Sequence, residues 1–331
     1  MSEMRAMVAD TATRLFGALT GDFAADMAAV EAAGLGDLLV AAGAGGFGGD
    51  WGDAAAVLGL AGAAAVALPI GESMLARRLA ADAGLDAHGL LTIAPVAEGA
   101  LADGRFSGVL RNVPWGGDVD AVLAVVDGRL LRLAVADAVV TRATNIAGEP
   151  RDSLVFDAAL AARGDAPALF EFGALLRVLQ AAGALGAALR LSVDYVNGRE
   201  QFGRKLAAFQ AVQQLLSQFA VEVAAVEAAA ALACAAADAG DAGFEIAVAK
   251  IRANLAIGVG TAAAHQVHGA IGFTQDYALH VLTRRLWSWR SEFGNDAHWS
   301  VRLGNAVAAA GADAFWPQLV ARSDAQNRRI A

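Results

Sequence analysis

The residues most suited to bind a ligand lie in a stretch that runs from Arg199 to Gln210 and reads REQFGRKLAAFQ. It separates two helical segments, so we expect Arg199 at the end of one helix and Gly203 at the turn into the next. An arginine at such a junction can bind a diphosphate, Phe202 can cover an aromatic ring, and Gln210 can reach a polar edge. On these residues alone, a helix-ending arginine beside a packed phenylalanine is the better explanation.

A second stretch runs from Gln266 to Tyr277 and reads QVHGAIGFTQDY. It ends one helix with small residues and begins another after Thr274. Gly269 and Gly272 allow a backbone to approach a ligand closely, and Gln266 offers both a donor and an acceptor. Without further context, this pattern is also that of a corner between two helices.

Taken together, the two stretches resemble the acyl-CoA dehydrogenase family, in which an R-x-x-F-G…Q segment and a Q-x-x-G-G-x-G-[FY] segment occur in this order and separation. The resemblance extends from about residue 175 to residue 294. In the family, neighbouring subunits supply these segments and hold FAD, with the arginine at the diphosphate and the glutamine near the adenosine. The resemblance therefore implies the following FAD contacts: Arg199, Phe202, Gln210, Gln266 and Gly269.

The position of the catalytic base departs from the family pattern. Dehydrogenation of an acyl thioester needs a carboxylate that removes the α-proton in a dry site while the β-hydride leaves for the flavin. Counting without gaps from the Gly-Phe corner at residues 272–273, the family's glutamate position falls on Phe293, and Glu292 lies one residue early. This offset turns a side chain by roughly 100° on a helix, so Glu292 is either the base or a solvated or ion-paired carboxylate.

Two further residues match the family in part. Arg177 resembles an arginine on the helix that lines the acyl-CoA cleft, where it would position the catalytic region or the thioester. The alternative is a surface arginine on an amphipathic helix. Some relatives carry the base one residue earlier, but this chain has Leu176 there. In the middle of the chain, Trp115 retains an aromatic wall for the flavin, although the hydroxyl-bearing strand of the family is replaced by VPWGG.

The elements that must position these residues follow from the periodicity of the sequence. Residues 1–88 show helical spacing interrupted by a glycine cluster, and residues 89–166 contain short valine-rich runs that predict a small β-sheet domain. Helical spacing returns over residues 167–331, where no strand is predicted. The helices are expected near 169–198, 204–239, 242–270, 276–291 and 296–323. This order predicts an α+β fold with an N-terminal helical layer, a middle β-domain and a C-terminal antiparallel four-helix-type bundle.

Composition narrows the classes of partner. The 34 acidic residues exceed the 25 Lys and Arg residues, and a net charge of −9 disfavours nucleic acid and acidic membrane surfaces. The single cysteine, Cys234, excludes an internal disulfide, and the N-terminus does not resemble a signal peptide. The histidine spacing does not match a metal site. We therefore expect a cytoplasmic protein without a bound metal and without nucleic-acid or membrane partners.

The resemblance implies an oxidoreductase that carries out FAD-dependent α,β-dehydrogenation of an acyl-CoA and passes electrons to an electron-transfer flavoprotein. The short, degenerate sequence is similar to the small subunits of actinobacterial heterotetrameric enzymes that act on steroid side-chain CoA thioesters, in which a partner chain can supply the base and most flavin contacts. The expected assembly is thus a dimer of dimers, with further copies of this chain or with a larger acyl-CoA dehydrogenase subunit. The alternative function is a non-catalytic structural subunit that completes a partner's FAD and substrate site.

Overall fold

The computed structural model describes residues 3–165 and 168–330. The chain divides into two compact units, Met1–Leu176 and Arg177–Ala331. The longest helix, α5 (Leu169–Gly198), begins in the first unit and continues into the second. The boundary at residues 166 and 167 that the sequence predicts between the middle and C-terminal domains lies outside the described residues.

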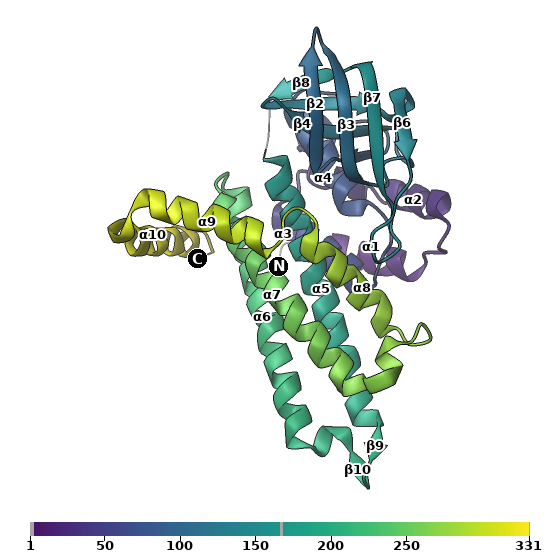
Figure 1. The fold of residues 1–331 in the computed structure, drawn as a ribbon, viewed down its shortest axis with the longest axis vertical. Helices are drawn as coiled ribbons and strands as arrows, with labels where there is room; N and C mark the ends of the chain where they lie inside the picture. The colour runs from purple at the N-terminus through teal and green to yellow at the C-terminus, as the bar shows by residue number, and fades with distance from the viewer. Residues whose placement is uncertain (1–2, 166–167, 331) are drawn as a thin grey trace. The chain divides into compact units, whose positions relative to one another are not determined.

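The first unit begins with the expected helical layer (Figure 1). Its helices are α1 (Glu3–Gly17), α2 (Phe23–Ala32), α3 (Trp51–Ala63) and α4 (Ile70–Asp82), with short 3-10 turns η1 (Leu35–Asp37) and η2 (Ala42–Ala44). The glycine cluster forms the loop before α3, and Gly45 and Gly48 adopt positive φ angles of 90° and 65° there. The Asp50 side chain then starts α3 by accepting a hydrogen bond from the Asp53 N–H, and the Asp53 carboxylate accepts one from the Asp50 N–H.

The β-domain of the first unit consists of two four-stranded sheets, in the orders β1-β4-β5-β8 and β2-β3-β7-β6. The strands are β1 (Leu91–Ile93), β2 (Val96–Ala102), β3 (Arg105–Pro114), β4 (Ala121–Val126), β5 (Arg129–Ala134), β6 (Ala138–Thr141), β7 (Arg151–Leu160) and β8 (Ala162–Asp165), with η3 (Val135–Asp137) before β6. Only the β1–β4 pair among them is parallel. One apolar cluster joins the two sheets and includes Phe106, Leu131 and Phe156.

The second unit is a helical bundle. After α5 it contains α6 (Gln210–Asp238), α7 (Gly243–His268), the 3-10 turn η5 (Gly269–Phe273), α8 (Leu279–Ser291), α9 (Asp296–Ala310) and α10 (Ala312–Ile330). Gly260 of α7 faces Phe219 of α6 so closely that an added Cβ would meet the ring at 2.4 Å. Small residues of this kind allow the alanine-rich helices to pack closely along their length.

The structure differs from the sequence prediction at two places in this unit. The chain does not enter α6 at residue 204: the strands β9 (Glu200–Gln201) and β10 (Arg204–Lys205) form a short hairpin, followed by η4 (Leu206–Ala208). The absence of strands after residue 167 was therefore a wrong prediction, because Phe202 and Gly203 adopt positive φ angles of 56° and 75° and turn the chain back. The expected helix at 296–323 is two helices, since Gly311 breaks it at φ 87°.

Three helices, α5, α6 and the helical stretch 243–273, are long and apolar enough to cross a membrane by length and composition alone. The protein itself buries 78% of the apolar window of α5 and 61% of that of the third. Only 39% of the α6 window is buried. Internal packing therefore accounts for the apolar character of two of these helices, while α6 keeps an exposed apolar face.

Candidate flavin-binding end and buried charged cluster

The first predicted motif lies at the tip of the second unit, where α5 ends at Gly198 and the β9–β10 hairpin follows. The Arg199 N–H still donates to the Tyr195 carbonyl, so its side chain projects from the last turn of α5. Phe202 forms the hairpin turn and is 90% exposed, with its ring edge-on to Phe209. Among the described residues, the side chains of Arg199 and Gln210 make no hydrogen bond or ion pair, and both are exposed.

The second motif lies where α7 ends. Gln266 is exposed, and its side chain has no hydrogen-bond partner within the described part of the chain. Gly269 adopts φ 63°, and nothing lies within 4 Å of a Cβ added there. The backbone at Gly269 is therefore open to close approach by a ligand.

An aromatic cluster joins the two motifs. The Tyr195 ring of α5 stacks on His268 of α7 with the centroids 4.5 Å apart, and Tyr277 packs against both rings. His268 Nδ1 lies 2.7 Å from the Ala264 carbonyl and Nε2 lies 3.2 Å from the Tyr277 hydroxyl. Burial lowers the pKa of His268, which favours the neutral ring, so Nδ1–H donates and Nε2 accepts. These contacts bring the two sequence motifs to one end of the bundle.

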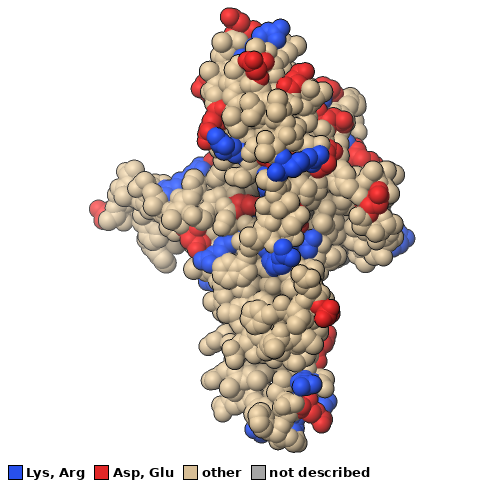
Figure 2. All heavy atoms as spheres, turned by 45° about the vertical axis from the view of Figure 1, so that its right-hand side comes forward, with Lys and Arg blue, Asp and Glu red and all other residues tan. Residues whose placement is uncertain are grey.

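We call this set the exposed bundle end, and it consists of Arg199, Phe202, Gln210, Gln266 and Gly269. Figure 2 shows that charged side chains gather at the lower tip of the molecule, below a longer and mainly uncharged surface. The charged residues exposed on the hairpin are Arg199, Glu200, Arg204 and Lys205. The exposed bundle end thus offers a cation, a free aromatic ring and open backbone in one region.

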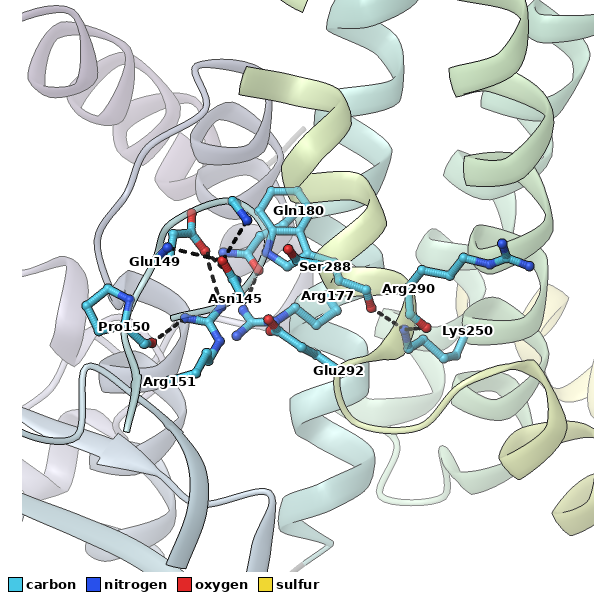
Figure 3. A network of polar contacts seen from close by, with 12 residues as sticks. Asn145, Glu149, Pro150, Arg151, Arg177, Gln180, Lys250, Ser288, Arg290 and Glu292 are labelled. Atoms are coloured by element: carbon cyan, nitrogen blue, oxygen red, sulfur yellow. Dashed lines mark hydrogen bonds and ion pairs between the residues drawn. The ribbon is translucent and has the colours of Figure 1, made fainter. Parts of the chain in front are cut away.

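The other two predicted residues of the second unit, Arg177 and Glu292, form an ion pair with each other. Arg177 is only 1% exposed, and its Nε donates to Glu292 Oε2 at 2.6 Å, although the two residues are 115 positions apart (Figure 3). Arg177 Nη1 also donates to Gln180 Oε1 at 2.7 Å. The surface-arginine alternative for Arg177 is therefore wrong. Of the alternatives for Glu292, the structure contains the ion-paired one, with the side chain 16% exposed.

The turn after Glu292 is tightly held. Phe293 occupies the position at which the ungapped count expects the family's glutamate, and it is buried with φ 52° and its ring 5.6 Å from the Arg177 guanidinium carbon. Its carbonyl accepts a hydrogen bond from Trp299 Nε1 at 2.9 Å. Gly294 follows at φ 95°, where an added Cβ would lie 2.5 Å from the same indole nitrogen. Side chain, backbone and neighbouring tryptophan together fix this turn.

Sequence reasoning missed Lys250, a fully buried lysine on α7. Its Nζ donates to Asn254 Oδ1 at 3.0 Å and to the Trp289 carbonyl at 2.6 Å, close to the end of α8 (Figure 3). Burial lowers the pKa of Lys250 to about 7, and the neighbouring Glu292 carboxylate opposes this shift. We call Arg177, Gln180, Lys250 and Glu292 the buried charged cluster. The only sequence signal for Lys250 was its place among apolar residues on both sides.

Trp115 lies in the first unit. It is buried at φ 49°, and the Arg151 guanidinium lies 5.2 Å from its ring centroid. Arg151 in turn donates to Glu149 Oε2 at 3.1 Å. Trp115 also lines a pocket of about 420 Å³ with the aromatic residues Phe16 and Phe23. The role of Trp115 as an aromatic wall for a flavin stays a prediction, and one face of its ring lies beside an arginine.

The segregated α+β fold, with both sequence motifs at one end of its helical bundle, agrees with the acyl-CoA dehydrogenase fold that the resemblance implies. The family model "Acyl-CoA dehydrogenase, C-terminal domain" matches residues 165–297. The acyl-CoA dehydrogenase IpdE2 of Mycobacterium tuberculosis is 31% identical over 253 residues, which cover 73% of each protein. IpdE2 of Mycolicibacterium smegmatis is 28% identical over 251 residues, covering 73% of this chain and 74% of the relative. The chain belongs to the acyl-CoA dehydrogenase family.

Solved structures confirm the predicted fold. A variant of the Tcur3481-Tcur3483 steroid ACAD superposes with a TM-score of 0.85 at 23% identity, over 94% of this chain and 99% of that one. A chain of the ChsE4-ChsE5 complex from Mycobacterium tuberculosis gives a TM-score of 0.84 at 21% identity, over 93% of this chain and 98% of that one. Butyryl-CoA dehydrogenase from Megasphaera elsdenii gives 0.80 at 15% identity, over 92% and 98%. These matches confirm the suspected family resemblance, and members of this family are FAD flavoproteins.

Proposed function

We propose that this chain is one subunit of a heteromeric acyl-CoA dehydrogenase, and that it supplies flavin-binding groups while a partner chain supplies the catalytic base. The observation that carries the proposal is the state of the base position. Phe293 occupies it, and the neighbouring Glu292 carboxylate holds the buried Arg177. A general base must be placed to reach the α-proton of the substrate, whereas here the candidate carboxylate is engaged inside its own chain.

The exposed bundle end fits FAD by the chemistry of its groups. The Arg199 guanidinium would bind the diphosphate, Phe202 would cover an aromatic ring, and the amides of Gln210 and Gln266 would reach polar edges. The open backbone at Gly269 admits close contact, since nothing fills the space of a Cβ there. When bound, FAD supplies the hydride acceptor for dehydrogenation. The protein groups at this end hold and orient the ligand, because none of them is a base or a nucleophile.

The exposure of these groups supports an assembly with another chain. A ring that is 90% exposed and an arginine without an internal partner form half of a binding site, which a second subunit would close. The structural likeness to a chain of the ChsE4-ChsE5 complex supports a larger acyl-CoA dehydrogenase subunit as that second chain, in a dimer of dimers. The likeness to the Tcur3481-Tcur3483 steroid ACAD supports a bulky acyl group, such as a steroid side chain, on the CoA thioester.

An electron-transfer flavoprotein would receive the electrons. This acceptor is supported by the chain's membership of the acyl-CoA dehydrogenase family, whose reaction removes electrons from the acyl-CoA.

A second candidate function is a self-sufficient dehydrogenase in which Glu292 is the base. It is favoured by the 16% exposure of the Glu292 side chain, because a carboxylate at the protein surface can exchange Arg177 for a substrate when a ligand binds. In that case the ion pair would be the resting state of the base.

The experiment that separates the two candidates measures the flavin-to-chain ratio and the bleaching of flavin absorbance by an acyl-CoA. The chain is purified alone and after co-expression with a larger acyl-CoA dehydrogenase subunit from the same genome. The proposal expects little flavin in the chain alone, and a yellow complex that bleaches and keeps its turnover in Glu292→Gln. A yellow, bleachable chain without a partner, inactivated by Glu292→Gln, would overturn the heteromeric proposal in favour of the second candidate. Arg14→Gln on the exposed face of α1 is the matched control for a surface charge.

A further inference from the structure

Lys250 is an unusual residue in this chain. The sequence contains only two lysines, Lys205 and Lys250, beside 23 arginines. Lys205 is exposed on the hairpin, whereas Lys250 lies in the first half of α7 and is 1% exposed. An ammonium is strongly hydrated in water, so its complete burial is costly unless several acceptors replace the water. The acceptors around Lys250 therefore indicate what this residue holds in place.

We propose that Lys250 is a positioning residue for the Glu292–Gly294 turn. Its Nζ donates to the Trp289 carbonyl at 2.6 Å and approaches the Arg290 carbonyl at 3.4 Å, and both carbonyls belong to the last turn of α8. Carbonyls at a helix C-terminus lack intrahelical donors and carry the negative end of the helix dipole. The N–H groups of Lys250 donate to these carbonyls and so fix the point at which the chain leaves α8.

The backbone that follows α8 needs these hydrogen bonds to keep its conformation. Glu292 is the C-cap of α8, and the next two residues, Phe293 and Gly294, both adopt positive φ angles. A phenylalanine in the left-handed region is strained and persists only where its surroundings determine it. Lys250 secures the helix side of this turn, and Trp299 secures the other side by donating to the Phe293 carbonyl. This inference rests on the proposed function only in that the turn carries Phe293 at the family's base position and Glu292 beside it.

The charges around Lys250 make the stability of the turn at the end of α8 depend on pH. Burial lowers the pKa of Lys250 to about 7; Arg177 and Arg290 add to this shift, and Glu292 and Asp296 oppose it. An opening of the α8 end that hydrates Lys250 would restore the pKa towards its ordinary value of 10.5. Opening therefore takes up a proton between pH 7 and pH 10.5, so acidification favours the open turn and a higher pH favours the closed one.

The test is hydrogen–deuterium exchange of the full chain, read on peptides that span residues 286–294 between pH 6.5 and pH 9 and corrected for intrinsic exchange rates. The protection of this segment should rise by up to tenfold per pH unit above pH 7, because one proton is linked to opening. Lys250→Met should abolish the slope, and Lys205→Met should leave it unchanged. A slope that persists in Lys250→Met, or wild-type protection that does not change with pH, would overturn the proposal.

A second measurement needs no change at the buried site. Lysine labelled at Cε gives two NMR signals, and Lys205→Arg identifies the one that belongs to Lys250. The proposal expects the Lys250 signal to titrate near neutral pH, and a Lys250 titration near the ordinary value of 10.5 would overturn it. Neither measurement uses flavin or acyl-CoA. If the protein never bound FAD, the proposed function would be wrong, but both measurements would still test the role of Lys250.

Discussion

The exposed bundle end and the buried charged cluster belong to the same helices but use their polar residues in opposite ways. In the buried charged cluster, Arg177, Glu292 and Lys250 all bond to partners within the chain. In the exposed bundle end, Arg199 and Gln266 have no such partner among the described residues. Polar groups that are satisfied internally contribute to folding, whereas groups left open in water are available to a ligand. Substitutions at the two places should therefore separate stability from binding.

The largest expected effect is the loss of Arg177. Arg177→Met leaves the Glu292 carboxylate without its buried partner, and breaking a buried ion pair in this way costs about 3–5 kcal/mol of unfolding free energy. The measurement is urea denaturation of the flavin-free chain. The matched control, Arg199→Met, should change the unfolding free energy by less than about 0.5 kcal/mol, because that arginine is exposed. Equal losses in the two variants would contradict the distinction between the two places.

The next effect is on flavin affinity, for which Arg199 is expected to matter more than Arg177. Arg199→Ala removes a charge-assisted contact to the diphosphate, which is worth about 1.5–3 kcal/mol, or roughly a 10–100-fold increase in the flavin dissociation constant. Fluorescence quenching in a flavin titration of the assembled protein measures this constant. If flavin affinity were unchanged in Arg199→Ala, the exposed bundle end would not be the flavin site.

The third effect is the pH dependence of stability. Unfolded Lys250 has an ordinary pKa of 10.5 and the folded one a pKa of about 7, so the unfolded state binds more protons between these values and stability rises with pH. From pH 7 to pH 9 this group should add about 2 kcal/mol to the unfolding free energy. Denaturation of Lys250→Met at the same two pH values should lack this increment. An identical pH dependence in both proteins would show that Lys250 does not titrate in this range.

The smallest effect is expected at the hairpin. Phe202 adopts φ 56° and is almost fully exposed, so Phe202→Gly removes backbone strain without removing buried contacts. The variant should be as stable as the wild type or more stable by up to about 1 kcal/mol. Flavin binding should weaken at the same time, because the covering ring is gone. Thermal unfolding and flavin titration of one preparation test both parts, and a loss of stability would assign Phe202 to folding rather than to binding.

Much of the fold could be predicted from the sequence because its signals are local. The helical period of α5 and α7 and the valine-rich runs of the β-domain each depend on neighbouring residues. The β9–β10 hairpin was missed because two-residue strands have no period to detect, and because Phe202 takes a positive φ angle that usually belongs to glycine. The break at Gly311 was hidden by alanine on both sides, which continues the helical pattern.

The candidate site could be predicted only where it forms a continuous motif. Arg199 and Gln266 were found because their neighbours carry the family pattern. The pairing of Arg177 with Glu292 joins residues 115 positions apart, and only the tertiary structure determines it. Lys250 gave no usable signal, since a single lysine in an alanine-rich helix is normally solvated and becomes functional only through the helix end that packs beside it.

The distribution of the two lysines also determines how the native protein reacts with amine-directed reagents. Lys250 is sealed from solvent, while Lys205 is exposed on the β9–β10 hairpin. Apart from the α-amino group, a lysine-reactive crosslinker, dye or sensor surface will therefore attach at this one hairpin. Immobilisation through amines would cover the exposed bundle end and mimic a loss of partner or flavin binding.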